Sequence, residues 1–387
     1  MRIFHLSDLH IGKQLHGFSL IEDQTFILKE ILGMIQERRP DLVLIAGDIY
    51  DKSAPSAEAV AVFDQFLTDL AGISDGPQVL MISGNHDSRE RLSFGSRLFA
   101  ANRLHIVGNA PDREHPEIRR MDFSDGEGLV HVYLLPFLRP SFVREIPGME
   151  EVKTYEEAVR ALLKAADIAS EERNLLVCHQ FFTWSGKGPE RSDSETVTVG
   201  GQDNIDGSAV SVFDYVAAGH IHRPQNVGSS KVRYCGSPLK YSVSEAEWGK
   251  SVTEVVLGRK GEVEINLLPL KPLHDVRKIK GTLAELTSRE VLLAADPEDY
   301  VSVVLTDEEE LYEPGTALTR VYPNLLEWQV ENSRTRHELQ ETVQAGEKKG
   351  VAELFGDFYF QMQGVELNEK QSAVIKRIAE HAEGGEE

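Results

Sequence analysis

The sequence has few cysteines and no long apolar run. Its two cysteines, Cys178 and Cys235, lie far apart and form no CxxC pair, which argues against a zinc–thiolate site. We expect both to be buried free thiols. No apolar stretch approaches the length needed to span a bilayer, so no membrane association is expected. The first residues also lack an apolar signal region, and a cytoplasmic protein is therefore expected.

Positive charge is also scarce. Lysine and arginine total 41 against 63 aspartates and glutamates, which gives a formal net charge of -22. Such a balance argues against a protein that coats nucleic acid by bulk charge. It does not exclude an enzyme that acts on phosphates, because bound divalent cations supply positive charge where a phosphate must lie. The 387 residues are enough for one large domain with one or two smaller ones.

The N-terminal part of the chain alternates between strand and helix patterns. Short apolar, β-branched runs predict strands, and apolar residues on a helical period predict helices. This alternation predicts a mainly parallel sheet covered by helices, hence an α/β protein. In chain order we expect a strand at 2–7, a helix at 23–38, a strand at 42–46, a helix at 55–70, a strand at 79–82 and a helical stretch at 88–101.

The remaining elements divide the chain into three parts. A first domain over 1–270 ends in a hairpin, and the order strand, helix, strand, strand predicts a small α+β domain over 273–330. The charged stretch 331–387 is expected to be a helical tail. Within the first domain we expect strands at 130–135, 175–178 and 212–217, a helix at 155–169, and the hairpin strands 251–257 and 263–268.

Clusters of polar residues directly follow several predicted strands. In open α/β sheets, ligands bind at the carboxyl ends of strands, and residues two apart project to the same side of an extended chain. Each cluster alone is a weak signal, but together they predict a metal site. Carboxylate, imidazole and amide ligands suit Mn²⁺ first, with Fe²⁺ or Zn²⁺ as alternatives. The clusters are DLH at 8–10, GDIYD at 47–51, GNHD at 84–87, CHQ at 178–180 and GHIH at 219–222.

With these motifs in this order, the sequence resembles the calcineurin-like metallophosphoesterases over about residues 1–270. The resemblance implies a β-sandwich flanked by helices, and therefore mixed sheets. It also implies a site for two divalent metal ions bridged by Asp48. The other implied ligands are Asp8, His10 and His222 for one ion, and Asn85, His179 and His220 for the second.

The same resemblance assigns the chemistry. A hydroxide between the two ions is the expected nucleophile, because the cations lower the pKa of water. His86 is expected to stabilise the transition state and to protonate the leaving alkoxide rather than to bind a metal. Asp51 matches the carboxylate that orients this imidazole in related phosphatases, whereas related archaeal nucleases carry a histidine there.

Three further segments resemble bacterial nuclease subunits that work with a long coiled-coil ATPase. They are residues 47–52, 84–92 and 234–242. This resemblance implies an exonuclease and endonuclease that processes DNA ends and hairpins in DNA repair and recombination, and a homodimer within a heterotetramer. The small domain would cap the active site. A phosphodiesterase for nucleotides or cyclic nucleotides is the alternative, and a non-catalytic scaffold is a third hypothesis.

Several residues stay open between a structural and a functional interpretation. Arg89 and Arg91 fit either solvated helix-start charges or DNA contacts. Lys240 and Tyr241 fit either packing beneath the site or a direct role, and Trp184 fits either the core or a base-stacking platform. In the tail, Leu354, Phe355, Phe358 and Met362 share one helical face, which would dock on the ATPase or fold back on the chain itself.

Overall fold

The computed structural model describes residues 1–195 and 203–333, with a few isolated positions between 355 and 375. The chain forms two compact units. The first contains residues 1–278, 295–302 and 322–327, and the remaining residues belong to the second. Among the residues that the structure describes, no helix is both long enough and apolar enough to cross a bilayer.

Two six-stranded sheets make up the centre of the first unit. Two short strand pairs accompany them: β2 (Gln14–Leu15) with β3 (Phe18–Ser19), and β10 (Phe181–Thr183) with β11 (Asn204–Asp206). The first sheet has the order β16 (Val263–Pro269), β15 (Ser251–Leu257), β1 (Arg2–Leu6), β4 (Leu42–Ala46), β5 (Gln78–Ile82) and β6 (Leu104–Val107). The second has the order β13 (Gln225–Val227), β14 (Ser229–Tyr234), β12 (Tyr215–Gly219), β9 (Arg173–His179), β8 (Gly128–Leu135) and β7 (Arg119–Asp125).

Both sheets are mixed, and the first contains the parallel strands that the element order predicts. Strands β1, β4, β5 and β6 run parallel, but β15 pairs antiparallel with β1 and with β16. In the second sheet β14, β12, β9 and β8 run parallel, and the edge strands β13 and β7 are antiparallel. The hairpin of β15 and β16 is confirmed. Mixed sheets are what the family resemblance implied.

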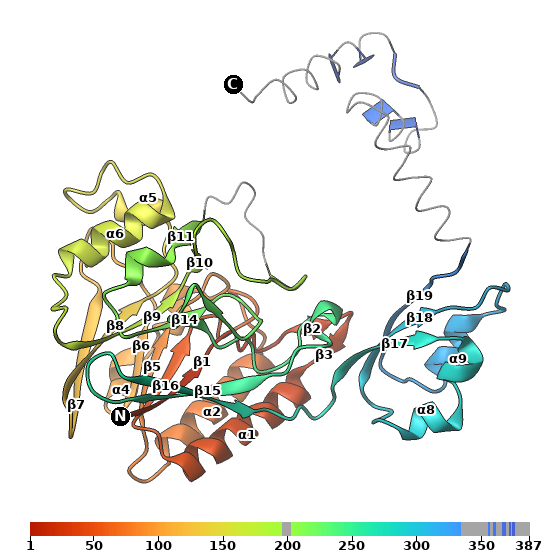
Figure 1. Ribbon diagram of the computed structural model, residues 1–387, viewed down its shortest axis with the longest axis horizontal. Coiled ribbons are helices and arrows are strands. Elements are labelled where there is room, and N and C mark those ends of the chain that lie inside the picture. The colour runs from red at the N-terminus through yellow and green to blue at the C-terminus, as the bar shows by residue number, and fades with distance from the viewer. Residues whose placement is uncertain are drawn as a thin grey trace. The chain divides into compact units, whose positions relative to one another are not determined.

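The sheets pack face to face with helices on their outer sides (Figure 1). Helices α1 (Ile21–Arg38) and α2 (Ala57–Ala71) cover the first sheet, and α5 (Pro140–Val143) and α6 (Tyr155–Ala165) cover the second. Strand β4 shows why its sequence is apolar throughout: Leu42 and Leu44 belong to the core between the sheets, whereas Val43 and Ile45 pack with the helix layer. A strand covered on both faces needs apolar residues at every position.

Three predicted elements differ most from their expected bounds. The expected helix at 88–101 is two short helices, α3 (Arg89–Leu92) and α4 (Ser96–Ala100), because Gly95 adopts a left-handed φ of 75° between them. Helix α6 ends at Ala165 rather than at residue 169. Strand β12 begins at Tyr215, since the residues before it form a turn in which the Phe213 N–H donates to the Val210 carbonyl.

A small three-stranded sheet follows the sandwich along the chain, in the order β17 (Val276–Gly281), β18 (Tyr300–Leu305), β19 (Leu325–Val330). Helices α7 (Leu283–Leu286) and α8 (Arg289–Leu293) precede β18, and α9 (Pro314–Thr319) precedes β19. Backbone hydrogen bonds join strand starts to starts and ends to ends, so the sheet is parallel. The expected α+β order is therefore corrected to α/β. The expected order lacked α9.

The boundary between the two compact units runs through these three strands. The proposed tail, 331–387, lies outside the described residues except for 331–333 and isolated positions such as Phe355, Val374 and Ile375.

Candidate metal centre

The seven predicted ligands come from loops at the carboxyl ends of strands in both sheets. Asp8 follows β1, Asp48 follows β4, and Asn85 follows β5. From the second sheet, His179 ends β9 and His220 follows β12. Parallel strands end at the same edge of a sheet, and stacking the sheets brings both edges together. Among the residues that the structure describes, three groups could hold metal ions: Asp8 with His10 and His222, Asp8 with Asp48 and His179, and His10 with Asp48 and His86.

The first ligand group surrounds one point. Candidate ligand atoms of Asp8, His10 and His222 all lie within 4.8 Å of one another. The Nε2 atoms of His10 and His222 face each other at 3.1 Å. All three side chains are buried. These residues therefore match the set expected for one ion.

The second group meets at the Asn85 amide. Its Oδ1 lies 3.0 Å from His179 Nε2 and 2.9 Å from His220 Nδ1. Asp48 lies between the two groups, with Oδ2 3.3 Å from His179 Nε2 and 3.6 Å from His10 Nε2. One carboxylate oxygen thus reaches ligands of both groups, which is the placement that a bridging carboxylate requires.

The loops that carry these ligands adopt an unusual backbone. Asp8, His10 and Asp48 have left-handed φ values of 53°, 43° and 50°. Holding a non-glycine residue in the left-handed region costs free energy, and such residues concentrate at functional sites. Gly84 gives the loops room to meet, since a methyl group there would collide with the Asp48 carboxylate and backbone.

The pKa values of three of the four imidazoles also fit cation binding. Burial lowers the pKa values of His10 and His222, and burial with the neighbouring His179 lowers that of His220 to about 3. These imidazoles are neutral, the form that binds metals. Burial opposes charge on Asp48 and His179, yet their mutual attraction holds the pKa of Asp48 well below its usual value and raises that of His179 to about 9. In addition, the buried His10 Nδ1 has no hydrogen-bond partner within the described part of the chain, where the Asp51 carboxylate lies 3.6 Å away. The residues therefore fit a dinuclear cation site.

His86 lies beside this centre. Its backbone N–H donates to Asp48 Oδ1 at 2.9 Å, and its ring stands edge-on to His10 with centroids 4.8 Å apart. The ring Nδ1 donates to the backbone carbonyl of Asp51 at 2.8 Å. The Asp51 carboxylate does not orient His86, contrary to our expectation. It pairs with Lys13 at 2.9 Å and lies 3.6 Å from His10 Nδ1.

Asp87 is a site residue that the sequence interpretation missed. Its carboxylate accepts backbone N–H groups from Gly84, Ile49 and Tyr50 at 2.9, 3.1 and 3.0 Å, and so ties the loop after β5 to the loop after β4. Burial and the nearby Asp48 raise its pKa to about 6. The sequence signal for Asp87 was its position as the last residue of the GNHD motif.

Tyr241 packs beneath the centre. Its ring meets those of His10 and His222 edge-on at 5.6 and 5.8 Å, and its hydroxyl donates to the Leu9 carbonyl. Gln24, also missed, donates to the His10 carbonyl at 2.7 Å. The structural interpretation of Tyr241 is therefore the one that the geometry favours.

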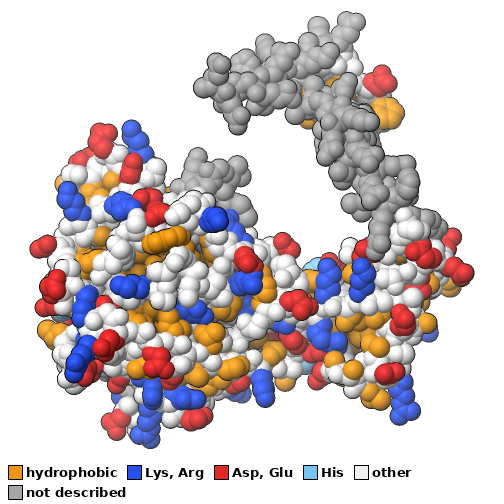
Figure 2. Space-filling view, in the orientation of Figure 1, with side chains coloured by type: hydrophobic (Ala, Val, Ile, Leu, Met, Phe, Trp, Pro, Cys, Tyr) orange, Lys and Arg blue, Asp and Glu red, His pale blue; other side chains and the backbone are white. Residues whose placement is uncertain are grey.

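The other open residues have varied surroundings. Lys240 pairs with Asp275 at 2.9 Å. The Arg89 guanidinium lies over the Phe142 ring at 3.8 Å, and Trp184 remains 39% exposed. Both cysteines are buried and free, as predicted. On the face of the first unit seen in Figure 2, lysine and arginine side chains are interspersed with acidic ones and form no continuous basic surface.

Comparisons with known proteins agree with this geometry. Residues 1–224 match the calcineurin-like phosphoesterase family, and residues 272–363 match a family described as type 5 capsule protein repressor C-terminal domain. The chain is 31% identical over 382 residues to the SbcD subunit of the SbcCD nuclease of Staphylococcus epidermidis, covering 98% of each chain. A solved dimetal phosphatase from Danio rerio is 16% identical, with a TM-score of 0.41 over 70% of this chain and 99% of that one. The family and relative matches show that the chain belongs to the calcineurin-like phosphoesterases and, within them, to the SbcD nuclease subunits.

Proposed function

We propose that this protein is a metal-dependent DNA exonuclease and endonuclease that processes DNA ends and hairpins together with an SbcC-like coiled-coil ATPase. The observation that carries the proposal is the convergence of two ligand groups on Asp48 in a chain that matches an SbcCD nuclease subunit over 98% of its length. A role in DNA repair and recombination follows from this activity.

Asp8, His10 and His222 would hold one divalent ion, and Asn85, His179 and His220 the other, with Asp48 shared. When bound, the two ions supply a metal-activated hydroxide and neutralise charge on the phosphate. We propose Mn²⁺ as the native metal, because the donors are carboxylate, imidazole and amide oxygen without thiolate. Bound cations also explain how an acidic protein handles a polyanion.

His86 would act on the leaving side of the phosphate. Its Nδ1 is committed to the Asp51 carbonyl, which leaves Nε2 for the substrate. From this position Nε2 of the doubly protonated ring stabilises the developing charge and gives its proton to the departing sugar oxygen, which leaves the ring neutral with its remaining proton on Nδ1. Because Asp51 holds the ring through its backbone, the Asp51 side chain acts on Lys13 and His10 instead.

The regions beyond the sandwich would serve substrate and partner binding. We propose that residues 273–330 cap the active site and help to position duplex DNA, and that residues 331–387 dock on the root of the ATPase coiled coil. Two copies of the chain would form a homodimer within the heterotetramer, in the cytoplasm.

A nicking assay on circular single-stranded DNA tests the function. We expect Mn²⁺-dependent nicking of the circle, which has no ends, and hydrolysis of bis-p-nitrophenyl phosphate by the same preparation. Fast hydrolysis of cyclic nucleotides with an intact circle would contradict the proposal and favour the nucleotide phosphodiesterase alternative. Asp48→Ala is the matched control, because nicking by a contaminating nuclease would persist unchanged in the Asp48→Ala preparation.

A further inference from the structure

A chain of hydrogen bonds, partly buried at Ser194, lies behind His222. Its Nδ1 is 2.7 Å from Ser194 Oγ, and Ser194 in turn donates to Glu245 Oε1 at 2.8 Å. A carboxylate only accepts hydrogen bonds, so the serine hydroxyl gives its hydrogen to Glu245 and accepts one from His222 Nδ1. This direction places the imidazole proton on Nδ1 and leaves Nε2, the atom facing His10, free to bind a cation.

Lys250 holds the far end of this chain. Its ammonium donates to Glu245 Oε2 at 2.6 Å, to the His222 carbonyl at 2.9 Å and to Ser237 Oγ at 2.8 Å. All three of its hydrogens are therefore used, and Glu245 and Lys250 are both buried. Lys250 thus fixes the backbone of His222 and the carboxylate behind its ring at the same time.

The other imidazoles of the centre are oriented differently. His179 Nδ1 bonds to the backbone carbonyl of Ala46 at 2.7 Å, and His10 Nδ1 has no hydrogen-bond partner among the described residues. A partner behind a metal-binding histidine sets its tautomer and raises its affinity as a ligand. Within this set of three, His222 is the one whose Nδ1 lies within hydrogen-bond distance of a side chain, Ser194, that leads to a buried ion pair.

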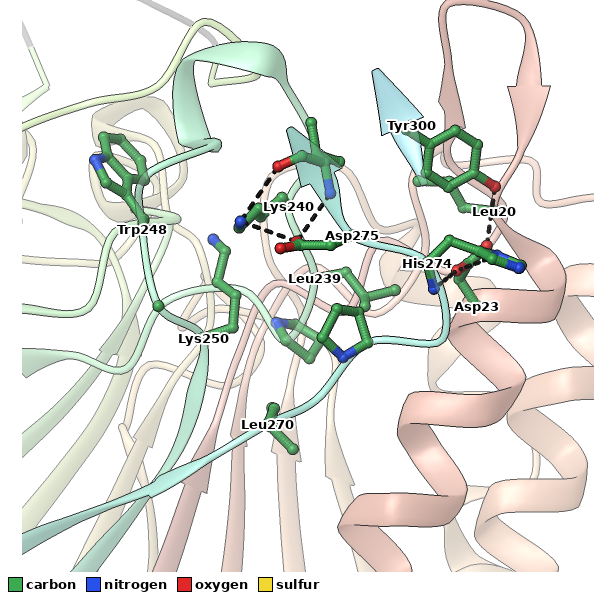
Figure 3. Close-up of a pocket in the computed structure, with 14 residues that line it drawn as sticks. Leu20, Asp23, Leu239, Lys240, Trp248, Lys250, Leu270, His274, Asp275 and Tyr300 are labelled. Carbon is green, nitrogen blue, oxygen red and sulfur yellow. Dashed lines mark hydrogen bonds and ion pairs between the residues drawn. The ribbon is translucent and has the colours of Figure 1, made fainter. Parts of the chain in front are cut away.

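Lys250 also lines a cavity of about 120 Å³ and lies there near Trp248 and Lys240 (Figure 3). The other charged groups in its wall have partners: Lys240 with Asp275, and Asp23 with His274. The charged groups that line the cavity are therefore paired within the protein, and the cavity itself carries no proposal.

We infer that Glu245, held by Lys250 and acting through Ser194, is a positioning residue that selectively supports the metal ion bound by Asp8, His10 and His222. The inference rests on the proposed two-metal site. The two ions are then held unequally. The ion bound by Asp8, His10 and His222 depends on a chain of side-chain hydrogen bonds that a single substitution breaks, whereas His179, a ligand of the other ion, is held by a backbone carbonyl.

Ser194→Ala is the sharpest test, because it removes the hydroxyl that joins the two side chains, leaves Glu245 Oε1 3.6 Å from His222 Nδ1, and keeps the Glu245–Lys250 ion pair. Mn²⁺ is titrated into the full-length apoprotein by calorimetry, and electron paramagnetic resonance separates coupled ion pairs from single ions. We expect the affinity for one of the two ions to fall about 10- to 100-fold while the other is unchanged. Ser194→Thr keeps the hydroxyl and should restore both affinities.

Glu245→Gln and a matched control complete the test. Glu245→Gln should weaken the same ion, and saturating Mn²⁺ should recover most of kcat, which separates positioning from chemistry. Asp214→Asn alters a carboxylate that is equally buried and lysine-paired but remote from the centre, and it should bind both ions normally. If wild type binds two ions and Ser194→Ala binds both equally well, the inference is wrong. Equal weakening of both ions would also overturn it, whereas failure of wild type to bind two ions would refute the proposed site itself.

Discussion

Replacing His86 by glutamine should separate the chemical step from metal binding. The backbone N–H of residue 86 holds Asp48 Oδ1 at 2.9 Å, and this contact survives the substitution. The variant should therefore keep its metal ions and its affinity for DNA. The variant loses the ring nitrogen Nε2, which the 2.8 Å hydrogen bond from Nδ1 to the Asp51 carbonyl orients toward the leaving group.

The size of the loss depends on the leaving group. General acid catalysis contributes about 10²- to 10⁴-fold, or roughly 3–5 kcal/mol of barrier. Cleavage of DNA expels a sugar alkoxide, which needs the proton, so the full loss is expected there. Bis-p-nitrophenyl phosphate expels a far more acidic phenol, which departs without a proton. Its hydrolysis by His86→Gln should fall much less.

The assay compares kcat on both substrates with metal content measured in the same samples. A large loss on DNA beside a small loss on the aryl ester supports the role of His86 as an acid. Loss of a bound metal ion in His86→Gln would refute the reasoning, because His86 would then be a ligand, as its place within 4.8 Å of His10 and Asp48 ligand atoms permits. Equal losses on both substrates would refute proton donation.

Four further results are expected. Asp51→Asn should lower kcat/KM on DNA less than the His86 change does, because its backbone carbonyl remains; steady-state kinetics checks this. Gly84→Ala should lose bound Mn²⁺ and activity, since its methyl group would enter the space of Asp48, and metal analysis would show it. Burial lowers the pKa of His5 from 6.5 to about 3, so the unfolded chain takes up the proton first. The contribution of the neutral His5 to the free energy of unfolding is full above about pH 6.5 and falls as the pH drops toward 3. At pH 5 it is smaller by about 2 kcal/mol. His5→Gln should remove this pH dependence, which denaturant unfolding curves would show. Truncation after Val330 should abolish binding of the coiled-coil ATPase in co-purification while nicking by the remaining chain persists.

The gathering of the ligands could be anticipated from sequence because it depends on local rules. Asp8, Asp48 and Asn85 each follow an apolar strand, and parallel strands deliver their ends to one edge. Because successive side chains of a strand point to opposite faces, Leu44 and Ile45 lie on opposite faces of β4. No knowledge of distant contacts is needed for these predictions.

The residues that position the ligands could not be predicted from the sequence, because their contacts join positions far apart in the chain. Ser194 and His222 lie 28 residues apart, and Ser194 and Glu245 lie 51 apart, with no shared spacing that marks them. The bond from His86 to the Asp51 carbonyl is equally hidden, because every residue has a backbone carbonyl. In the small sheet, the Pro-Gly pair at the start of α9 fits a turn or a helix N-terminus, and only the structure distinguishes them.

The central claim is that Asp48 joins two metal ions into one DNA-cleaving centre. It is tested most directly by counting bound Mn²⁺ and measuring nicking of circular single-stranded DNA in the same preparations of wild type and Asp48→Ala. The account predicts two ions and Mn²⁺-dependent nicking for wild type, and fewer than two ions with no detectable nicking for Asp48→Ala. Two bound ions with undiminished nicking in Asp48→Ala, or full activity of wild type with a single ion, would contradict it.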